Sequence, residues 1–152
     1  MSFSLRYDYI KFPAEPSVAF PRRFSASRPV IPIRLIKGSK DVRYHAIIDS
    51  GADLCIFHAQ IGEVLGLAIE SGKLLEFNGI SGQQLTAYFH DIQIEVGGHR
   101  FDCYAGFSRD IDNMPYGLLG QIGFFDLFSI VFDYKKQRIE IKLKNNVPRG
   151  GR

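Results

Sequence analysis

Apolar and polar residues alternate along much of this chain, in short runs separated by glycine and proline. The pattern is clearest over residues 84–96, where Ile92, Ile94 and Val96 are each separated by one polar residue. A period of two residues is typical of a β-strand with one face in the core and the other in water. Gly97-Gly98 follows directly and predicts a tight turn into a returning strand.

The same reasoning predicts further strands at residues 30–36, 42–48, 73–77, 101–105, 130–132 and 138–143. The period changes at residues 59–67, where Ile61, Val64 and Leu65 have helical spacing and Gly66 can end a short helix. A second short apolar helix is predicted at residues 122–128. Many short strands with one or two short helices indicate an all-β barrel.

Residues 1–28 show no steady period, and their prolines, with Pro29 just beyond, are expected to break any regular element. We therefore expect three parts: an N-terminal arm at residues 1–28, one domain at residues 29–144, and a basic flexible tail at residues 145–152. A chain of 152 residues, 45% of them hydrophobic, suits one domain with a real core.

The composition indicates in which cellular compartment the protein is expected. No apolar stretch approaches the ~18 residues of a membrane span, and the N-terminus lacks the apolar segment of a secretory signal. The only two cysteines, Cys55 and Cys103, lie in apolar runs, which predicts buried, reduced thiols in a cytoplasmic protein.

The net charge of +3 is unevenly distributed: residues 1–28 carry +3, residues 29–134 carry −6, and residues 135–152 carry +6. We interpret the basic ends as solvated segments. The alternative is contact with a phosphate backbone or an acidic partner. Because no nucleic-acid-binding motif accompanies the basic residues, no nucleic-acid partner is expected.

The strongest candidate for chemistry is Asp49-Ser50-Gly51, which directly follows the apolar run Ala46-Ile47-Ile48. A strand there would deliver a carboxylate to a tight loop, and glycine would let the backbone come close to a substrate. A strand-terminal turn is the alternative interpretation. Peptide hydrolysis by carboxylates needs two of them sharing a proton, so a catalytic version of this chain has to be a dimer.

Three features in order resemble the retropepsin-like aspartic proteases, the single-lobed relatives of pepsin, and their cellular and bacterial members in particular. The first is Asp49-Ser50-Gly51-Ala52-Asp53 at a strand end, and the second is a glycine-bearing hairpin tip, Gly79-Ile80-Ser81-Gly82. The third is Leu118-Leu119-Gly120, followed by an apolar segment and a strand. The resemblance covers residues 30–143 and implies an acid protease barrel.

The resemblance also implies a function and a site. It implies an aspartic endopeptidase, active as a homodimer, that hydrolyses extended peptide or protein substrates through an activated water, with no cofactor and no metal. The implied catalytic residues are Asp49, Ser50 and Gly51; the implied substrate-binding residues are Ala52 and Asp53, with Gly79, Ile80, Ser81 and Gly82 in a flap; Leu118, Leu119 and Gly120 would support the catalytic loop.

Two positions depart from the family pattern. Ser50 stands where threonine is common, and its hydroxyl can make the same hydrogen bonds without the methyl group that stiffens χ1. Gln121 stands where viral members usually have Arg, Asn or Asp.

Two other functions stay open. One is a catalytically silent dimeric module on the same fold that binds peptides or proteins. The other is a zinc site formed by Cys55, His58, His99 and Cys103, which has less support because no CxxC or HExxH motif is present.

Overall fold

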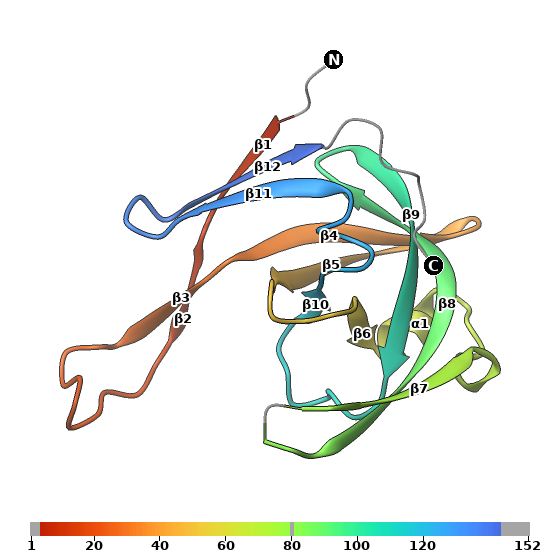
Figure 1. Ribbon diagram of the computed structural model, residues 1–152, viewed down its shortest axis with the longest axis horizontal. Helices are drawn as coiled ribbons and strands as arrows, with labels where there is room; N and C mark the ends of the chain where they lie inside the picture. Colours follow the sequence, from red (N-terminus) through yellow and green to blue (C-terminus); the bar gives the residue numbers. More distant parts are fainter. Residues whose placement is uncertain (1–3, 80, 144–152) are drawn as a thin grey trace.

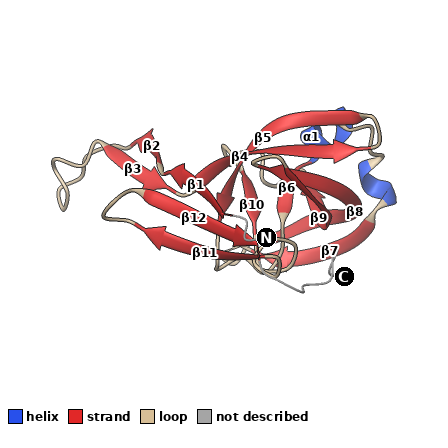
Figure 2. Ribbon diagram, turned by 90° about the horizontal axis from the view of Figure 1, so that it is seen from above, coloured by secondary structure: helices blue, strands red, loops and turns tan. Residues whose placement is uncertain are grey.

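Seven strands form the main sheet, and their pairing closes it into a barrel. In sheet order they are β4 (Val30–Lys37), β5 (Lys40–Ile48), β10 (Gly117–Leu119), β6 (Ile56–His58), β9 (His99–Ser108), β8 (Gln84–Val96) and β7 (Lys73–Asn78). The last part of the long strand β8 also pairs with β4, with Ile94 opposite Leu35, and this pairing closes the sheet. The computed structural model describes residues 4–79 and 81–143, and Figures 1 and 2 show the arrangement. The predicted all-β barrel is confirmed.

The barrel core is filled by alternate residues of these strands, as the two-residue period predicts. Ile92, Ile94 and Val96 of β8 are buried, whereas Gln93 between them is exposed. The aromatic rings of Phe57, Phe107, Phe124 and Phe128, all fully buried, lie in the same core cluster. The predicted hairpin between β8 and β9 is present and turns at Gly97-Gly98.

A second sheet of three strands covers one side of the barrel. Its order is β1 (Ser4–Asp8), β12 (Arg138–Leu143) and β11 (Phe128–Asp133), all antiparallel. Ile139 and Ile141 of β12 point into the barrel core, and Leu5 of β1 packs against it. The predicted hairpin at residues 130–143 is therefore present.

The expectation that prolines prevent regular structure in residues 1–28 was wrong. Besides β1, this segment forms a hairpin of β2 (Ile10–Pro13) and β3 (Ser25–Arg28). Pro13 is tolerated because it is the last residue of a strand in a two-stranded sheet, and Pro16 and Pro21 lie in the connecting loop. The hairpin projects from the barrel at the left of Figures 1 and 2.

One predicted helix is present and the other is not. Helix α1 (Ala59–Val64) ends where Gly66 has a φ of +82°, and the amides of Gly66 and Leu67 bond the carbonyls of Glu63 and Gly62, a Schellman motif. A 3₁₀ turn, η1 (Ile69–Ser71), follows. Instead of the second helix, Ile122 forms a parallel β-bridge with Leu54 and residues 123–127 form turns, because Gly123 has a φ of +107°, which no α-helix accommodates. Within the described residues, no helix is long and apolar enough to cross a membrane.

Candidate active site

Asp49 lies where three strands come together. It directly follows β5, which pairs in parallel with β10, and the Asp49 amide donates a 3.0 Å hydrogen bond to the Leu119 carbonyl. One residue earlier, the Ile48 amide donates a 2.9 Å bond to the Pro29 carbonyl, between β3 and β4. The main chain at Ile48 and Asp49 is thus held by Leu119 of β10 on one side and by Pro29, just before β4, on the other, while the side chain of Asp49 stays partly exposed.

The loop after Asp49 folds back on the carboxylate. Oδ1 of Asp49 accepts a 2.9 Å hydrogen bond from the Gly51 amide, and the Asp49 carbonyl accepts one of 3.1 Å from the Ala52 amide. A Cβ atom on Gly51 would lie 3.2 Å from this Oδ1, so any other residue would press on the carboxylate. This hydrogen bond from the Gly51 amide orients the carboxylate of Asp49.

The segment Leu118-Leu119-Gly120 lies directly beside this loop. Leu118 and Leu119 pair with Ile47 and Ile48 of β5. A Cβ on Gly120 would lie 2.3 Å from the Leu54 carbonyl oxygen, so only glycine allows the two backbones this approach.

Gln121, which departs from the family pattern, contacts the loop that follows Asp49. Its side-chain amide donates a 2.8 Å hydrogen bond to the Ser50 carbonyl. Its backbone amide donates to the Ala52 carbonyl, and the next amide, of Ile122, donates to the Asp53 carbonyl, each at 2.9 Å. The available signal was its position next to Gly120, which already brings the chain against the loop.

The two cysteines lie beneath the same loop. The Gly120 amide approaches Sγ of Cys55 at 3.4 Å, and this thiol is 3.5 Å from the Ile122 carbonyl. Cys55 and Cys103 are both buried and not joined by a disulfide, as predicted. Their mutual hydrogen bond, together with burial, raises the pKa of the Cys103 thiol well above its ordinary value, so it stays protonated.

Three of the predicted site residues are exposed to solvent. Ser50, Gly51 and Asp53 are exposed, and Ala52 is partly buried. The Ser50 hydroxyl makes no hydrogen bond to any described residue, although its carbonyl is bonded by Gln121.

The predicted glycine-bearing tip connects β7 to β8. The Gly82 amide bonds the Gly79 carbonyl and the Gly79 amide bonds the Gln83 carbonyl, both at 2.9 Å, and Gly82 has a φ of +80°. Ser81 is exposed and its hydroxyl bonds the Gln83 side chain. Ile80 lies outside the described residues. In Figure 1 this tip and the Asp49 loop both lie toward the left side of the barrel.

An apolar cluster links the Asp49 loop to the β7–β8 hairpin. Its buried members are Ile56, Ala87, Phe89 and Ile111, and its partly exposed members are Leu54, Phe77, Tyr104, Met114 and Leu118. The cluster includes residues next to the Asp49 loop as well as residues of the hairpin strands. An apolar surface therefore extends from Leu54 and Leu118, beside the Asp49 loop, toward the hairpin.

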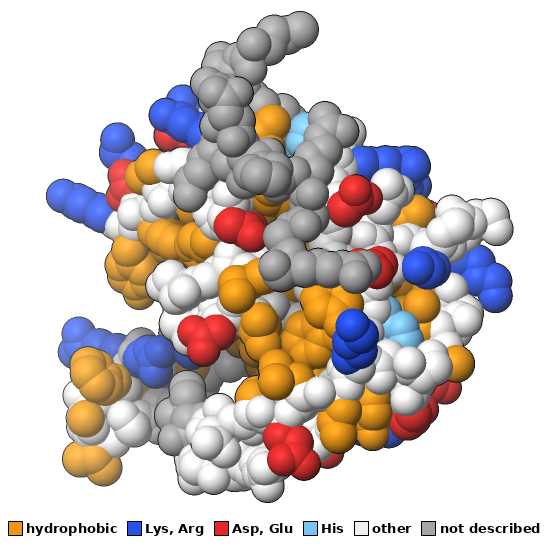
Figure 3. Space-filling view, turned by 45° about the vertical axis from the view of Figure 1, so that its right-hand side comes forward, with side chains coloured by type: hydrophobic (Ala, Val, Ile, Leu, Met, Phe, Trp, Pro, Cys, Tyr) orange, Lys and Arg blue, Asp and Glu red, His pale blue; other side chains and the backbone are white. Residues whose placement is uncertain are grey.

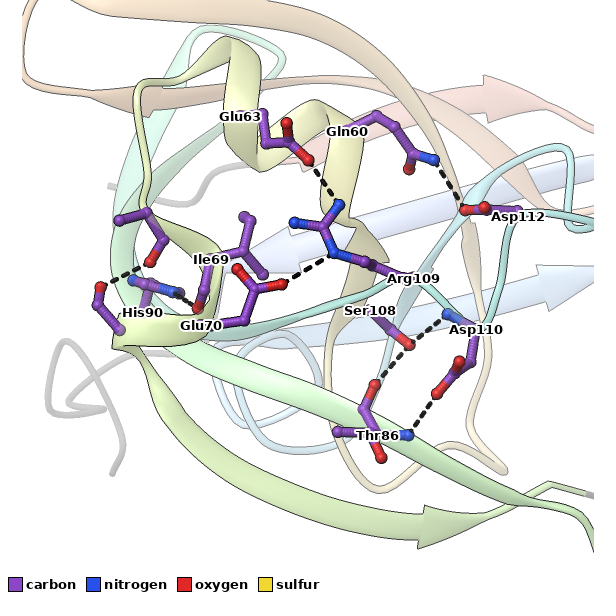
Figure 4. A network of polar contacts seen from close by, with 12 residues as sticks. Gln60, Glu63, Ile69, Glu70, Thr86, His90, Ser108, Arg109, Asp110 and Asp112 are labelled. Atoms are coloured by element: carbon purple, nitrogen blue, oxygen red, sulfur yellow. Dashed lines mark hydrogen bonds and ion pairs between the residues drawn. The ribbon is translucent and has the colours of Figure 1, made fainter.

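The base of the same hairpin is held by a polar network shown in Figure 4. Oδ2 of Asp110 accepts a 2.8 Å bond from the Thr86 amide, and the Ser108 hydroxyl donates a 2.6 Å bond to the Thr86 carbonyl. Nearby, Arg109 pairs with Glu63 of α1 and Glu70 of η1. Asp110 and Ser108 thus hold β8 beyond its last pairing with β9, whereas Arg109 ties the end of β9 to α1 and η1. None of these side chains was predicted from the sequence to have a role.

The residues of the zinc alternative do not come together as a ligand set. Cys55 and Cys103 are adjacent in the core, but the two ring nitrogens of His58 face the Tyr44 hydroxyl and the Met114 carbonyl. The ring of His99 packs against Phe128. Across residues 4–79 and 81–143, no group of three or more His, Cys, Asp or Glu side chains is placed to hold a metal ion.

Comparison with known proteins gives two kinds of match. A family model described as aspartyl protease matches residues 33–121. A retropepsin-like aspartic protease from Rickettsia conorii is 12% identical, with a TM-score of 0.58 over 94% of this chain and 92% of its own. EIAV protease, in complex with the inhibitor HBY-793, is 16% identical, with a TM-score of 0.47 over 62% of this chain and 82% of its own. No curated protein matches. The Rickettsia match confirms the retropepsin-like fold.

Proposed function

Because this chain belongs to the aspartyl protease family, we propose that it is an aspartic endopeptidase that works as a homodimer. One chain supplies one Asp49, which is partly exposed and lies in the loop between β5 and β6. A two-fold axis beside this loop would bring the second Asp49 to the first, because a two-fold interface uses the same surface of both copies. The observation that carries the proposal is the position of Asp49, held by the Leu119 carbonyl and the Gly51 amide.

In this dimer the two carboxylates would share one proton, since two such groups about 3 Å apart do not both ionise. The ionised carboxylate would take a proton from a bound water. The protonated one would donate to the oxygen of the scissile carbonyl as the water attacks its carbon. The Asp49 of either chain can take either part, because the axis makes them equivalent.

The neighbouring residues have parts that fit their geometry. Ser50, whose hydroxyl has no partner within the described chain, would bond the loop of the other copy. Gly51 would leave room for the substrate backbone, and the exposed carboxylate of Asp53 would accept from a substrate amide. Ala52 would form the floor between them.

We assign the β7–β8 tip to a flap that covers the bound peptide and excludes water. Gly79, Ser81 and Gly82 would form it together with Ile80. An extended peptide would lie between this tip and the Asp49 loop, with alternate side chains against the apolar cluster around Phe77 and Met114. In this proposal residues 29–144 make up the protease domain and residues 1–28 are an added arm.

The test is a peptide-library digest with the purified protein and with Asp49→Asn. We expect cleavage by the first and none by the second, with circular dichroism and dimerisation unchanged. A statine-type transition-state mimic should inhibit the cleavage. If the protein binds the mimic but cuts no peptide, the silent peptide-binding module is the correct function instead.

A further inference from the structure

The hairpin of β2 and β3, residues 10–28, is an arm with apolar side chains at its far end. Val18, Phe20 and Phe24 have exposed fractions of 102%, 63% and 67%. Figures 1 and 2 show the arm projecting away from the barrel, and in Figure 3 apolar and basic side chains lie together at the lower left, where it ends. A two-stranded hairpin is only marginally stable by itself, and exposed aromatic side chains at its end indicate a surface that another molecule covers.

The root of the arm lies next to the backbone that carries Asp49. Strand β3 runs through Pro29 into β4, and the Pro29 carbonyl accepts the amide of Ile48, the residue before Asp49. On the other strand, the ring of Phe12 packs edge-on against Tyr116, with ring centres 5.7 Å apart, immediately before β10. Both strands of the arm are thus fixed to the two strands that position the candidate catalytic loop.

We propose that this arm lies on a second copy of the chain and clasps it beside the two-fold axis. The inference rests on the proposed function, which puts Asp49 of both copies at that axis. An arm rooted one residue from Asp49 that projects beyond its own barrel extends across the partner. By symmetry the partner's arm extends across the first copy, so two arms contribute to one interface.

The charges favour a copy of this chain as the occupant. Residues 10–28 contain four Lys or Arg residues and one acid, whereas residues 29–134, the barrel without β12 and the basic turn before it, carry a net charge of −6. The basic arm is therefore attracted to the acidic body of another copy and repelled by the other arm. This complementarity orients the arm toward the partner's barrel and makes the association weaken with salt.

The test measures dimerisation separately from cleavage. In an Asp49→Asn background, chosen so that the proposed proteolysis does not alter the sample, Phe20→Ser together with Phe24→Ser should raise the dimer dissociation constant at least about tenfold in sedimentation velocity. The matched control, Val64→Ser with Leu74→Ser, removes two apolar side chains of 57% exposure each on α1 and β7, at the other side of the barrel in Figure 1, and should leave the constant unchanged. Equal constants for the arm variant and the unmodified arm overturn the inference.

A crosslinking experiment tests the position of the arm without removing the apolar side chains at its end. Cys55 and Cys103 are buried, so Val18→Cys introduces an accessible thiol at the arm's end. A short thiol–amine crosslinker should join two chains through Cys at position 18 but not through the control Ser39→Cys in the β4–β5 turn. If Val18→Cys gives intramolecular products and no products that join two chains, the arm folds back on its own chain. This result contradicts the inference.

The outcomes separate this inference from the proposed function. Cleavage that depends on Asp49, with dimerisation independent of Phe20 and Phe24, overturns the clasp alone. Dimerisation that depends on the arm, with cleavage that survives Asp49→Asn, overturns the protease proposal alone. A chain with its arm intact that stays monomeric at all concentrations overturns both.

Discussion

The side-chain amide of Gln121 donates a 2.8 Å hydrogen bond to the carbonyl oxygen of Ser50. This bond joins the segment after Gly120 to the residue after Asp49, and both its donor and its acceptor are neutral groups. Residue 121 is therefore linked to the loop by a neutral donor.

Gln121→Ala should impair cleavage without unfolding the protein. One neutral hydrogen bond contributes about 1 kcal/mol, so we expect the rate to fall on the order of five- to tenfold. Gln121→Glu should cost more, because it sets a carboxylate against the Ser50 carbonyl. The matched control is Gln93→Ala, which loses a bond to Asp102 on the outer barrel surface. Equal rates for the Gln121→Ala and Gln93→Ala variants would show that the bond does not position the loop.

Gly120→Ala should destabilise the fold itself. The added Cβ would lie 2.3 Å from the Leu54 carbonyl oxygen and 2.7 Å from that of Ala52, and backbone atoms cannot move aside as a flexible side chain can. We expect a loss of roughly 3 kcal/mol or more in urea unfolding. Gly79→Ala is the comparison, since its Cβ would meet only the flexible side chains of Gln83 and Leu85, at 3.3 Å or more. A Gly120→Ala protein as stable as the Gly79→Ala protein would contradict the close approach.

The long strands and the Asp49 loop could be predicted from the sequence because they have strong local signals. Alternation over residues 84–96 and Gly97-Gly98 indicated the β8–β9 hairpin, and Asp49-Ser50-Gly51 after an apolar run indicated the loop. By contrast, β6 and β10 have three residues each and lie inside the sheet, too short to show a period.

Other features depend on contacts between distant residues. The apolar residues at 122–128 suggested a helix, but the chain turns at Gly123, and Phe124, Leu127 and Phe128 are buried in the core from this irregular segment. Gln121 and Asp110 bond residues that lie 71 and 24 positions away in the chain. The local sequence around each residue therefore could not predict its partner. The arm's strands were missed because their proline residues lie at a strand end and in a loop, positions where proline is tolerated.

Because of Tyr44, the free energy of unfolding should decrease as the pH rises in the alkaline range. Burial raises the pKa of its hydroxyl from 10.0 to about 12, and the hydroxyl bonds Nδ1 of His58 and accepts from the His58 amide. A folded-state pKa above the unfolded one favours the protonated form. Its contribution, on the order of 2–3 kcal/mol, is therefore complete below pH 10 and lost as pH rises through 12.

The measurement for Tyr44 compares urea unfolding of the protein and of Tyr44→Phe between about pH 8 and about pH 12. The variant should be less stable by about 1–2 kcal/mol at pH 8, because the His58 ring loses a partner. The difference should shrink toward pH 12, since only the native protein has this group to ionise. A constant difference over the whole range would rule out titration of Tyr44.

A shared proton on the two Asp49 carboxylates predicts a bell-shaped pH profile for cleavage. Activity should fall in acid, when both carboxylates are protonated, and again toward alkaline pH, when the shared proton is lost. We expect an acidic or near-neutral optimum in kcat/KM measured from about pH 3 to about pH 9. A rate that stays flat across this range is incompatible with an acid pair.

Acid unfolding has to be separated from this profile. The hydrogen bond from Arg100 lowers the pKa of Glu95, and that from Arg109 lowers the pKa of Glu70. A lowered folded-state pKa stabilises the protein above the unfolded value, and this stabilisation is lost only as pH falls through the lowered one. These ion pairs therefore persist to more acidic pH than unpaired carboxylates, and circular dichroism at each pH shows whether the fold persists with them.

Asp110 should control how firmly the β7–β8 hairpin is held. Its carboxylate accepts the Thr86 amide at 2.8 Å, two residues beyond Tyr88, where β8 makes its last pairing with β9. Asp110→Ala leaves that amide to water, so hydrogen exchange at residues 84–86 should accelerate, by about tenfold for a bond of about 1 kcal/mol or slightly more. In the proposed enzyme a looser hairpin closes less often over the substrate, so kcat/KM should fall with it.

The loop provides its own controls for Asp110. Asp110→Asn keeps a side-chain oxygen as acceptor and should restore most of the protection of the Thr86 amide. Asp112→Ala removes a carboxylate two residues away whose bond is to Gln60, outside the hairpin, and should leave exchange at residues 84–86 unchanged. If the Asp110→Ala and Asp112→Ala proteins exchange at the same rate there, the hairpin is held by strand pairing alone. The loss of activity would then need a different cause.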